Sequence, residues 1–310
     1  MGTGVLTVTR VLLITNPAAA RTQPTAVQAV VDVLGSAGWM VEVVATGGPG
    51  DAKSLAAQGV SDGMDLVAVF GGDGTTMQAA GALVGTDVRL GLIPGGTGNL
   101  LAGNLRVPTS PARAAEALVA GQSRAFDLGR MERTDGVHYF AVACGAGYDA
   151  RVMAETSAAL KHKWGMAAYV ATTFRLMADL RSATHLITID GAEYEAHAAI
   201  VLVANCAEVI PPFVKFGHGI SPEDGELDVI VLRADSFRES VSAVWELLRQ
   251  RGGQSPNGGR VGYARGRDIR VETTPAQPVQ LDGEPGGYTP FRATVVPGAV
   301  RIIVPRTKTD

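Results

Sequence analysis

The chain has 310 residues, of which 46% are hydrophobic and 18% are charged, and its formal net charge is −3. This length allows one large domain or two packed ones, and the composition is that of a globular protein rather than a disordered one. Because a nucleic-acid-binding domain normally carries a strong basic excess, the charge argues against nucleic acid as a partner.

Short apolar runs alternate with segments of helical spacing up to about residue 125. Nearly continuous apolar strands are typical of a parallel sheet, whose strands are buried on both faces. A β-α-β-α alternation places helices on both sides of such a sheet. The expected strands are 10–15, 39–45, 65–70 and 88–93, and the expected helices are 22–37, 51–60 and 77–84.

From Phe126 onward, strand-like runs separated by turn signals replace the alternation. The Asp190-Gly191 pair between two of them predicts a tight hairpin. The expected strands are 126–131, 137–143, 184–190, 194–204, 227–232, 268–271 and 279–281, with helices at about 163–180 and 236–250. The sequence therefore predicts an α/β fold: a doubly wound parallel-sheet domain at 1–126 and an antiparallel β-sandwich-like domain at 127–304. Residues from about 305 to 310 are expected to return to the first domain.

A glycine-rich loop, Gly71–Thr75 (GGDGT), follows the third expected strand directly and precedes a helix. Glycines let main-chain N–H groups approach an anion closely, and the helix N-terminus adds partial positive charge. Asp73 would repel phosphates by itself, but its carboxylate is a suitable ligand for Mg²⁺. The alternative is a plain turn in which Asp73 caps the helix.

A second loop of this kind, Pro94–Asn99 (PGGTGN), follows the fourth expected strand. Neighbouring parallel strands end at the same edge of a sheet, so we expect the two loops to converge. Two convergent Gly-Thr loops favour a phosphate site over a pair of ordinary turns.

GGDGT followed by PGGTGN resembles the diacylglycerol-kinase catalytic family, which includes sphingosine, ceramide and bacterial lipid kinases. The resemblance extends over nearly the whole chain through Asn16-Pro17, Thr46, Asp127, Asp224-Gly225 and the LDGE sequence at 281–284. Phosphofructokinases and NAD kinases are more distant relatives that share GGDG. The resemblance thus implies a phosphofructokinase/NAD-kinase-like first domain and phosphorylation of a lipid hydroxyl by ATP and Mg²⁺.

The resemblance also implies which residues surround ATP. One departure is that a Gly is common a few residues after Asn-Pro in the family, whereas this chain continues as Ala-Ala-Ala-Arg. Arg21 itself is a candidate phosphate contact. The implied ATP-binding positions are Asn16, Pro17, Ala18, Ala19, Ala20, Thr46, Gly71, Gly72, Asp73, Gly74, Thr75, Thr76, Met77, Gly96, Thr97 and Asn99.

Asp282-Gly283-Glu284 matches the family's DGE, in which the glutamate is the general base. A positioned carboxylate can accept the proton of an alcohol as the γ-phosphoryl bond forms. By resemblance the catalytic candidates are Glu284, Asp73, Asp127 and Asp282, with Asp73 and Asp127 in a network that links Mg²⁺ to the base. Taken alone, an Asp-Gly pair is a common hairpin turn and Asp127 is a solvated strand-edge residue.

The resemblance implies a structural Mg²⁺ in the loop that contains Asp224. Its ligands would be the Asp224 carboxylate and the main-chain carbonyls of Ser221 and Glu226. An oxygen-only site with few charges suits Mg²⁺. The alternative is a simple acidic turn.

Two other enzyme classes and one non-enzymatic binding function are alternatives to the lipid-kinase interpretation. An NAD kinase or a sugar-phosphate kinase shares GGDG, but NAD kinases typically carry Asn-Glu after GGDGT and phosphofructokinases usually have Ser at the position of Thr75. A nucleotide-binding regulator without kinase activity would not need Asp73, Asp127 and Glu284 together.

The sequence also bears on location and partners. The two cysteines support neither a disulfide framework nor a zinc site, so a reduced, cytoplasmic compartment fits best. Residues 1–10 lack the pattern of a secretory signal, and no apolar run approaches the ~20 residues that span a bilayer. We therefore expect a lipid substrate, peripheral contact with the inner face of the membrane and no nucleic acid, and a homodimer is compatible with the sequence.

Overall fold

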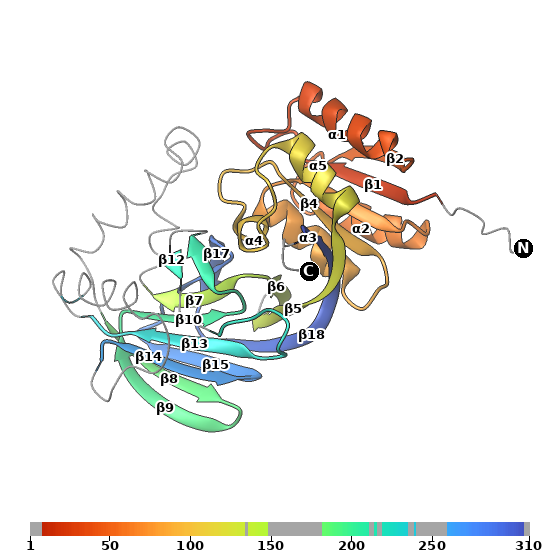
Figure 1. The fold of residues 1–310 in the computed structure, drawn as a ribbon. Coiled ribbons are helices and arrows are strands. Elements are labelled where there is room, and N and C mark those ends of the chain that lie inside the picture. Colours follow the sequence, from red (N-terminus) through yellow and green to blue (C-terminus); the bar gives the residue numbers. More distant parts are fainter. Residues whose placement is uncertain are drawn as a thin grey trace, which may run out of the picture. The chain divides into compact units, whose positions relative to one another are not determined.

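The computed structural model describes residues 8–133, 136–147, 182–210, 214–215, 219–234, 239 and 259–306 (Figure 1). The protein forms two compact units. The first unit is Met1–Ala125 with Ala299–Asp310, and the second is Phe126–Gly298. The helices expected at 163–180 and 236–250 lie outside the described residues, apart from Glu239.

The first unit is a parallel sheet with helices on both faces, as the alternation of apolar runs and helical segments predicts. Its strand order is β2-β1-β3-β4-β18, and β1 to β4 pair in parallel. The elements are β1 (Arg10–Thr15), α1 (Pro24–Ser36), β2 (Met40–Ala45), α2 (Asp51–Ser61), β3 (Leu66–Gly71), α3 (Asp73–Leu83), β4 (Arg89–Pro94), α4 (Leu100–Asn104) and α5 (Pro111–Ala120).

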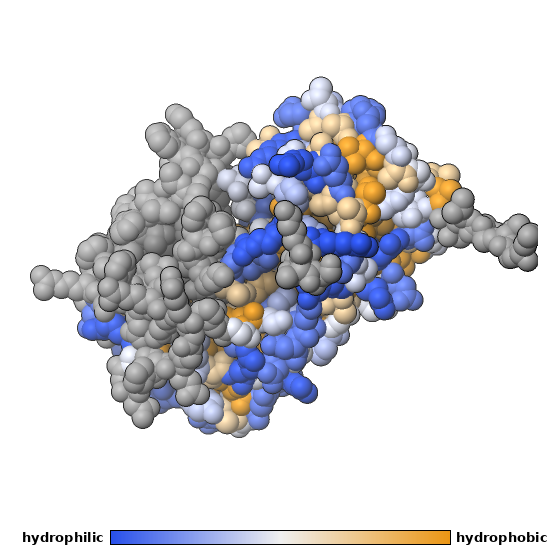
Figure 2. Space-filling view, in the orientation of Figure 1, coloured by the Kyte–Doolittle hydropathy of each residue, from blue (hydrophilic) through white to orange (hydrophobic). Residues whose placement is uncertain are grey.

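The helices form two layers: α1 packs with α5 on one face of the sheet, and α2 packs with α3 on the other (Figure 1). Between them β3 is buried along its whole length, whereas the edge strand β2 exposes Met40 and Val43. Figure 2 shows hydrophobic residues interspersed among hydrophilic ones over this unit. None of the helices that the structure describes is long and apolar enough to cross a membrane.

One long strand, β18 (Phe291–Val304), contributes to both units. Its last part pairs in parallel with β4, at Arg301↔Arg89 and Ile302↔Leu90. Its first part pairs antiparallel with β15 (Asp268–Thr274). The C-terminus thus returns to the first unit from Ala299, earlier than the sequence predicts.

The second unit consists of antiparallel strands in two main sheets. One contains β5, β6, β8, β9, β15 and the first part of β18, and the other has the order β14-β13-β10-β7-β16-β17. The further bounds are β5 (Gln122–Arg133), β6 (Gly136–Phe140), β7 (Ala143–Gly147), β8 (Ala183–Ile189), β9 (Ala192–Ala198), β10 (Ile200–Ala204), β11 (Glu208–Ile210), β12 (Val214–Lys215), β13 (Leu227–Leu232), β14 (Val261–Gly266), β16 (Pro278–Leu281) and β17 (Glu284–Tyr288).

One hairpin of the second unit forms as the sequence predicts, whereas two of the expected strands are each divided. Asp190 and Gly191, with φ of 49° and 88°, join β8 to β9 as the expected two-residue turn. The runs expected at 137–143 and 194–204 are each divided into two strands, which belong to different sheets. Side chains from both sheets, such as Phe140, Ile187, Val203 and Val229, form one shared apolar core. The second unit is therefore a β-sandwich.

We predict that Gly129→Ala destabilises this core. Gly129 of β5 lies opposite Phe140 of β6, and an added Cβ would stand 2.0 Å from the nearest atom of the fully buried Phe140 ring. Displacing the ring should lower the free energy of unfolding by about 1–3 kcal/mol, measured by urea denaturation. Gly262→Ala is the matched control in another strand, where the nearest atom is 3.7 Å away. Equal unfolding midpoints for the two variants would show that the ring does not constrain Gly129.

Candidate active site

The parallel sheet of the first unit brings several expected site residues to one edge. The pairings Thr15↔Ala45, Thr15↔Phe70 and Gly71↔Pro94 align the carboxyl ends of β1 to β4. The loops that follow β1, β3 and β4 therefore start side by side, where ligands bind to open α/β sheets.

The loop after β1 is held in shape by its own side chains. Asn16 Oδ1 accepts the N–H of Ala18 at 3.0 Å, and Thr22 Oγ1 donates to the carbonyl of Asn16 at 2.6 Å. The loop is also joined to both of its neighbours. Asn16 Nδ2 donates to Thr75 Oγ1 at 2.9 Å, and the N–H of Arg21 donates to the carbonyl of Gly95 at 3.0 Å. The loop therefore has a defined conformation without the glycine that is usual in the family.

The GGDGT loop passes directly into α3, which begins at Asp73, earlier than the helix expected at 77–84. Gly72 is the N-cap residue, in extended conformation, and its carbonyl accepts the N–H and the hydroxyl of Thr76, each at 3.0 Å. The first N–H groups of a helix have no carbonyl partner within it and carry partial positive charge. The start of α3 thus has the partial positive charge that the sequence predicts for a phosphate site.

The PGGTGN loop packs against the GGDGT loop through main-chain contacts. The N–H groups of Gly95 and Gly96 both donate to the carbonyl of Gly71, at 2.8 and 3.2 Å. A Cβ added to Gly96 would lie 2.7 Å from the Cα of Gly72. Only glycine allows this approach, so the two loops converge as their positions in the sequence predict.

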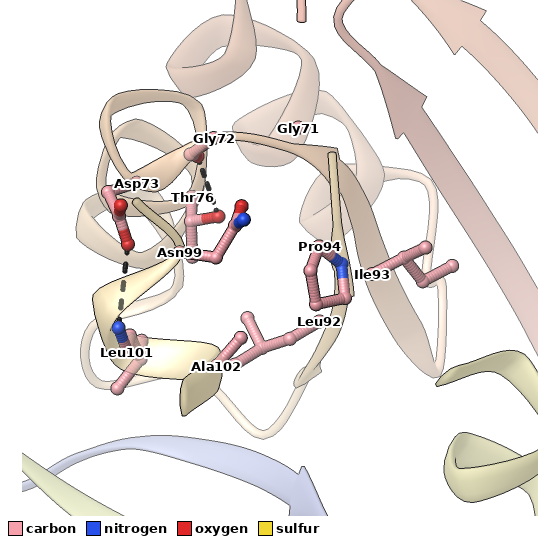
Figure 3. Close-up of a pocket in the computed structure, with 10 residues that line it drawn as sticks. All are labelled: Gly71, Gly72, Asp73, Thr76, Leu92, Ile93, Pro94, Asn99, Leu101 and Ala102. Carbon is pink, nitrogen blue, oxygen red and sulfur yellow. Dashed lines mark hydrogen bonds between the residues drawn. The ribbon is translucent and has the colours of Figure 1, made fainter. Parts of the chain in front are cut away.

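Asn99 stabilises the second loop internally, whereas Asp73 of the first loop bonds to the segment that follows the second (Figure 3). Asn99 has a φ of 50°, its Oδ1 accepts the N–H of Gly96, and its Nδ2 donates to the carbonyl of Gly96. Asp73 Oδ1 accepts the N–H of Leu101 at 3.4 Å. A small pocket lies behind them, lined by Gly71, Gly72, Asp73, Thr76, Leu92, Ile93, Pro94, Asn99, Leu101 and Ala102.

The implied ATP residues differ in what they can offer a ligand. Thr75 and Thr76 are buried, and their hydroxyls already bond to Asn16 and Gly72. Thr97 is exposed, and Thr46 is half-buried at the end of β2, where its N–H bonds to the carbonyl of Thr15. The remaining implied positions are exposed at Pro17, Ala18, Ala20 and Gly74 and half-buried at Ala19 and Met77.

In the second unit, Asp282 is buried and acts as an acceptor of main-chain hydrogen bonds. Its Oδ2 accepts the N–H of Ala141 at 2.7 Å, and its Oδ1 accepts those of Val142 and Ala143 at 2.8 and 3.0 Å. Burial raises the pKa of the Asp282 carboxyl to about 6, against the lowering effect of these N–H groups. Asp282 therefore holds the main chain of residues 141–143 in place.

Glu284 is exposed at the start of β17, directly after the turn formed by Asp282 and Gly283. Both turn residues have positive φ, 46° and 83°, and Leu281 pairs with Glu284 across the turn. Gly283 N–H donates to the side chain of the buried Gln280 at 2.8 Å. Hydrogen bonds to Gln280 and to Asp282 thus hold the turn before Glu284. That Glu284 acts together with the glycine loops stays a prediction.

Asp127 is buried and bonded through both carboxylate oxygens. Its Oδ2 accepts the N–H of Gly225, and its Oδ1 accepts the N–H of Gly298, both at 2.7 Å. Asn205 was not predicted from the sequence, although it is a polar residue inside the apolar run VLVANC. Its Nδ2 donates to the carbonyls of Asp127 and Ala141 at 2.8 Å each. Asp127, Asn205 and Asp282 therefore share one buried polar network.

In the loop expected to hold a structural Mg²⁺, two carboxylates lie near the guanidinium of Arg265. Asp224 Oδ1 accepts the N–H of Glu226, while its Oδ2 lies 3.6 Å from Nη1 of Arg265. The same Nη1 lies 3.6 Å from Glu226 Oε2. Within the ranges that the structure describes, no group of three or more His, Cys, Asp or Glu side chains could hold a metal ion. The Asp224 carboxylate and the main-chain carbonyls of Ser221 and Glu226 stay the predicted Mg²⁺ ligands, with Asp224 lying beside a guanidinium.

Comparison with known families matches both halves of the chain. Residues 10–131 match the model described as diacylglycerol kinase catalytic domain. Residues 142–304 match the model described as YegS C-terminal NAD kinase beta sandwich-like domain. The second match covers the β-sandwich, and the first covers the glycine loops.

Individual relatives agree with these matches. A diacylglycerol kinase of Mycobacterium tuberculosis is 30% identical over 86% of this chain and 85% of its own length. A Pseudomonas fluorescens protein named "Probable lipid kinase YegS-like" is 32% identical over 90% of both chains. The crystal structure of a Bacillus anthracis diacylglycerol kinase has the same fold, with a TM-score of 0.74, 23% identity and coverage of 95% and 96% of the two chains. The chain therefore belongs to the diacylglycerol kinase catalytic-domain family of lipid kinases.

Proposed function

We propose that this protein transfers the γ-phosphoryl group of ATP, bound with Mg²⁺, to a hydroxyl of diacylglycerol or a related lipid. The observation that carries the proposal is the interlocking of three loops at one edge of the first unit's sheet, with Gly96 in contact with Gly72. The protein's family membership and the names of its relatives support a lipid acceptor over NAD or a sugar phosphate.

ATP would bind with its phosphates at the N-terminus of α3. The first N–H groups of α3 have no carbonyl partner within the helix, and their partial positive charge favours the anion. Asp73 lies in the first turn of α3, so its carboxylate is suited to contact the Mg²⁺ that accompanies ATP, directly or through water. Phosphoryl transfer depends mainly on such positioning and charge neutralisation.

Glu284 would act as the general base. The acceptor oxygen forms a bond to the γ-phosphorus as the bond from that phosphorus to ADP breaks, and the carboxylate takes the hydroxyl proton. Glu284 is exposed, whereas Asp282 and Asp127 are buried and their oxygens accept main-chain N–H groups. This contrast supports Glu284 as the residue that reaches the acceptor, with Asp282 holding the hairpin on which it stands.

Such an enzyme would meet its acceptor at a lipid surface. We propose peripheral contact with the inner face of the membrane from the cytoplasm, since diacylglycerol resides in bilayers. Vesicle flotation with and without diacylglycerol measures this contact directly, and a protein that phosphorylates only dispersed, soluble acceptors would contradict it.

Gly96→Ala should abolish tight nucleotide binding while leaving the fold intact. The added methyl group would meet the backbone of Gly72, so the two loops must separate. We expect the dissociation constant for ATP, measured by calorimetry, to rise by at least about tenfold, or 1.4 kcal/mol. Gly35→Ala in α1 is the control, because a Cβ there meets nothing within 4 Å. Unchanged ATP affinity in Gly96→Ala would contradict the placement of the phosphates.

Glu284→Gln should lower kcat with the true acceptor by about 10²–10⁴-fold, the usual contribution of a general base. ATP affinity should not change, because the substitution is isosteric and lies outside the glycine loops. Glu193→Gln, at another exposed strand position, is the matched control. Transfer of labelled phosphate is measured with diacylglycerol, NAD and fructose 6-phosphate in parallel. Full turnover by Glu284→Gln excludes the base, and transfer to NAD or the sugar phosphate alone excludes the lipid acceptor.

A further inference from the structure

Three carboxylates alternate along the segment that enters β13. Asp224, Glu226 and Asp228 are separated by one residue each, and Asp228 lies within the strand. Their side chains are 28%, 35% and 14% exposed. Like charges this close repel one another, and partial burial weakens the screening by water. The segment therefore requires a cation.

Arg265 of β14 provides that cation from the neighbouring strand. It lies directly opposite Asp228 in the antiparallel register. Its Nε and Nη2 donate to Oδ1 and Oδ2 of Asp228 at 3.0 and 3.1 Å, a bidentate pair. Nη2 also donates to the carbonyl of Gly219 at 2.8 Å. Because Nη1 lies 3.6 Å from both Asp224 and Glu226, one planar group spans the acidic loop, residues 219–228.

The acidic loop also supports Asp127. The N–H of Asp127 donates to the carbonyl of Pro222 at 2.7 Å, and Asp127 Oδ2 accepts the N–H of Gly225 at the same distance. The position of Asp127 therefore depends on the conformation of this loop. Whatever cation holds the loop also holds part of the buried network around Asn205.

A divalent metal ion and Arg265 would compete for this place. Asp224 Oδ2 faces the guanidinium, and Asp224 Oδ1 is engaged by the N–H of Glu226. An ion bound to Asp224 Oδ2 would stand within a few ångströms of the guanidinium charge, and Mg²⁺ also demands a regular octahedron of oxygens. We propose that the guanidinium of Arg265 is the permanent cation of the acidic loop and replaces a bound divalent metal ion there.

The environment of Asp228 indicates what loss of Arg265 would do. Asp228 is only 14% exposed, and its carboxylate is held by a bidentate pair with Arg265. Without the guanidinium, this carboxylate and its two acidic neighbours would lose that counter-ion. The loop would then lose its cross-strand bonds and would be able to accept a metal ion.

The first test uses the unmodified protein without nucleotide. Thermal unfolding is followed in EDTA, in millimolar Mg²⁺ and in millimolar Ca²⁺, and the midpoint should be the same in all three. A rise in Mg²⁺ that Asp224→Asn abolishes would overturn the proposal, because it would place a metal ion in the acidic loop. A rise that persists in Asp224→Asn originates elsewhere and agrees with it.

The second test removes the guanidinium. Arg265→Gln should lower the midpoint by roughly 2–8 °C, and Ca²⁺ or Mg²⁺ should restore part of that loss. Arg270→Gln is the matched control, since Arg270 also pairs with a carboxylate, Glu272 at 2.8 Å, but is 59% exposed. A loss no greater than that of the control would overturn the proposal. If Arg265→Gln does not fold, Arg265→Lys against Arg270→Lys tests the bidentate geometry in the same way.

Discussion

The contact between two glycine backbones, Gly96 against Gly72, is the constraint on which the convergence of the glycine loops depends. A single Cβ at Gly96 would stand 2.7 Å from the Cα of Gly72, so the approach exists only because Gly96 has no side chain. Parallel pairing of β3 with β4 aligns the two loops, and the shared carbonyl of Gly71 fixes their spacing. Main chain rather than side chain forms the surface offered to an anion, which suits a ligand whose negative charge is spread over many oxygens.

Much of this unit could be predicted from sequence because its local signals agree with its fold. The run at 10–15 is a strand with those bounds, since an apolar stretch ended by Asn-Pro has few other uses. The start of α3 was misplaced because Asp73 and Gly74 look like loop residues, although they form the first helical turn. In the second unit β11, β12, β14, β17 and β18 were not predicted. The sequence EPGGY and the Pro-Gly pair at 297–298 resemble turns. Pairing with β16 makes the first extended, and pairing of β18 with β15 and β4 makes the second part of a long strand.

The residues of the candidate site also differ in how far sequence predicts them. Residues in contiguous motifs, such as Gly96 and Glu284, were predicted by resemblance, because a motif preserves the spacing of residues along the chain. Asn205 and Arg265 were not found, because their partners lie far away in sequence: Asp127 for the first and Asp228 for the second. Cross-strand register decides which residues become neighbours, and one sequence does not reveal that register. For the same reason the guanidinium opposite the acidic loop could not be predicted.

The division of β18 between the two units has a consequence for protein synthesis. The strand that completes the first unit's sheet beside β4 follows the other strands of the β-sandwich in the sequence, so it leaves the ribosome after them. The edge of β4 therefore stays uncovered while the whole β-sandwich is being translated. An incomplete chain lacks this strand, and Ile302 with it, which is fully buried in the finished protein. The first unit's sheet is thereby completed only in chains that already contain the second unit.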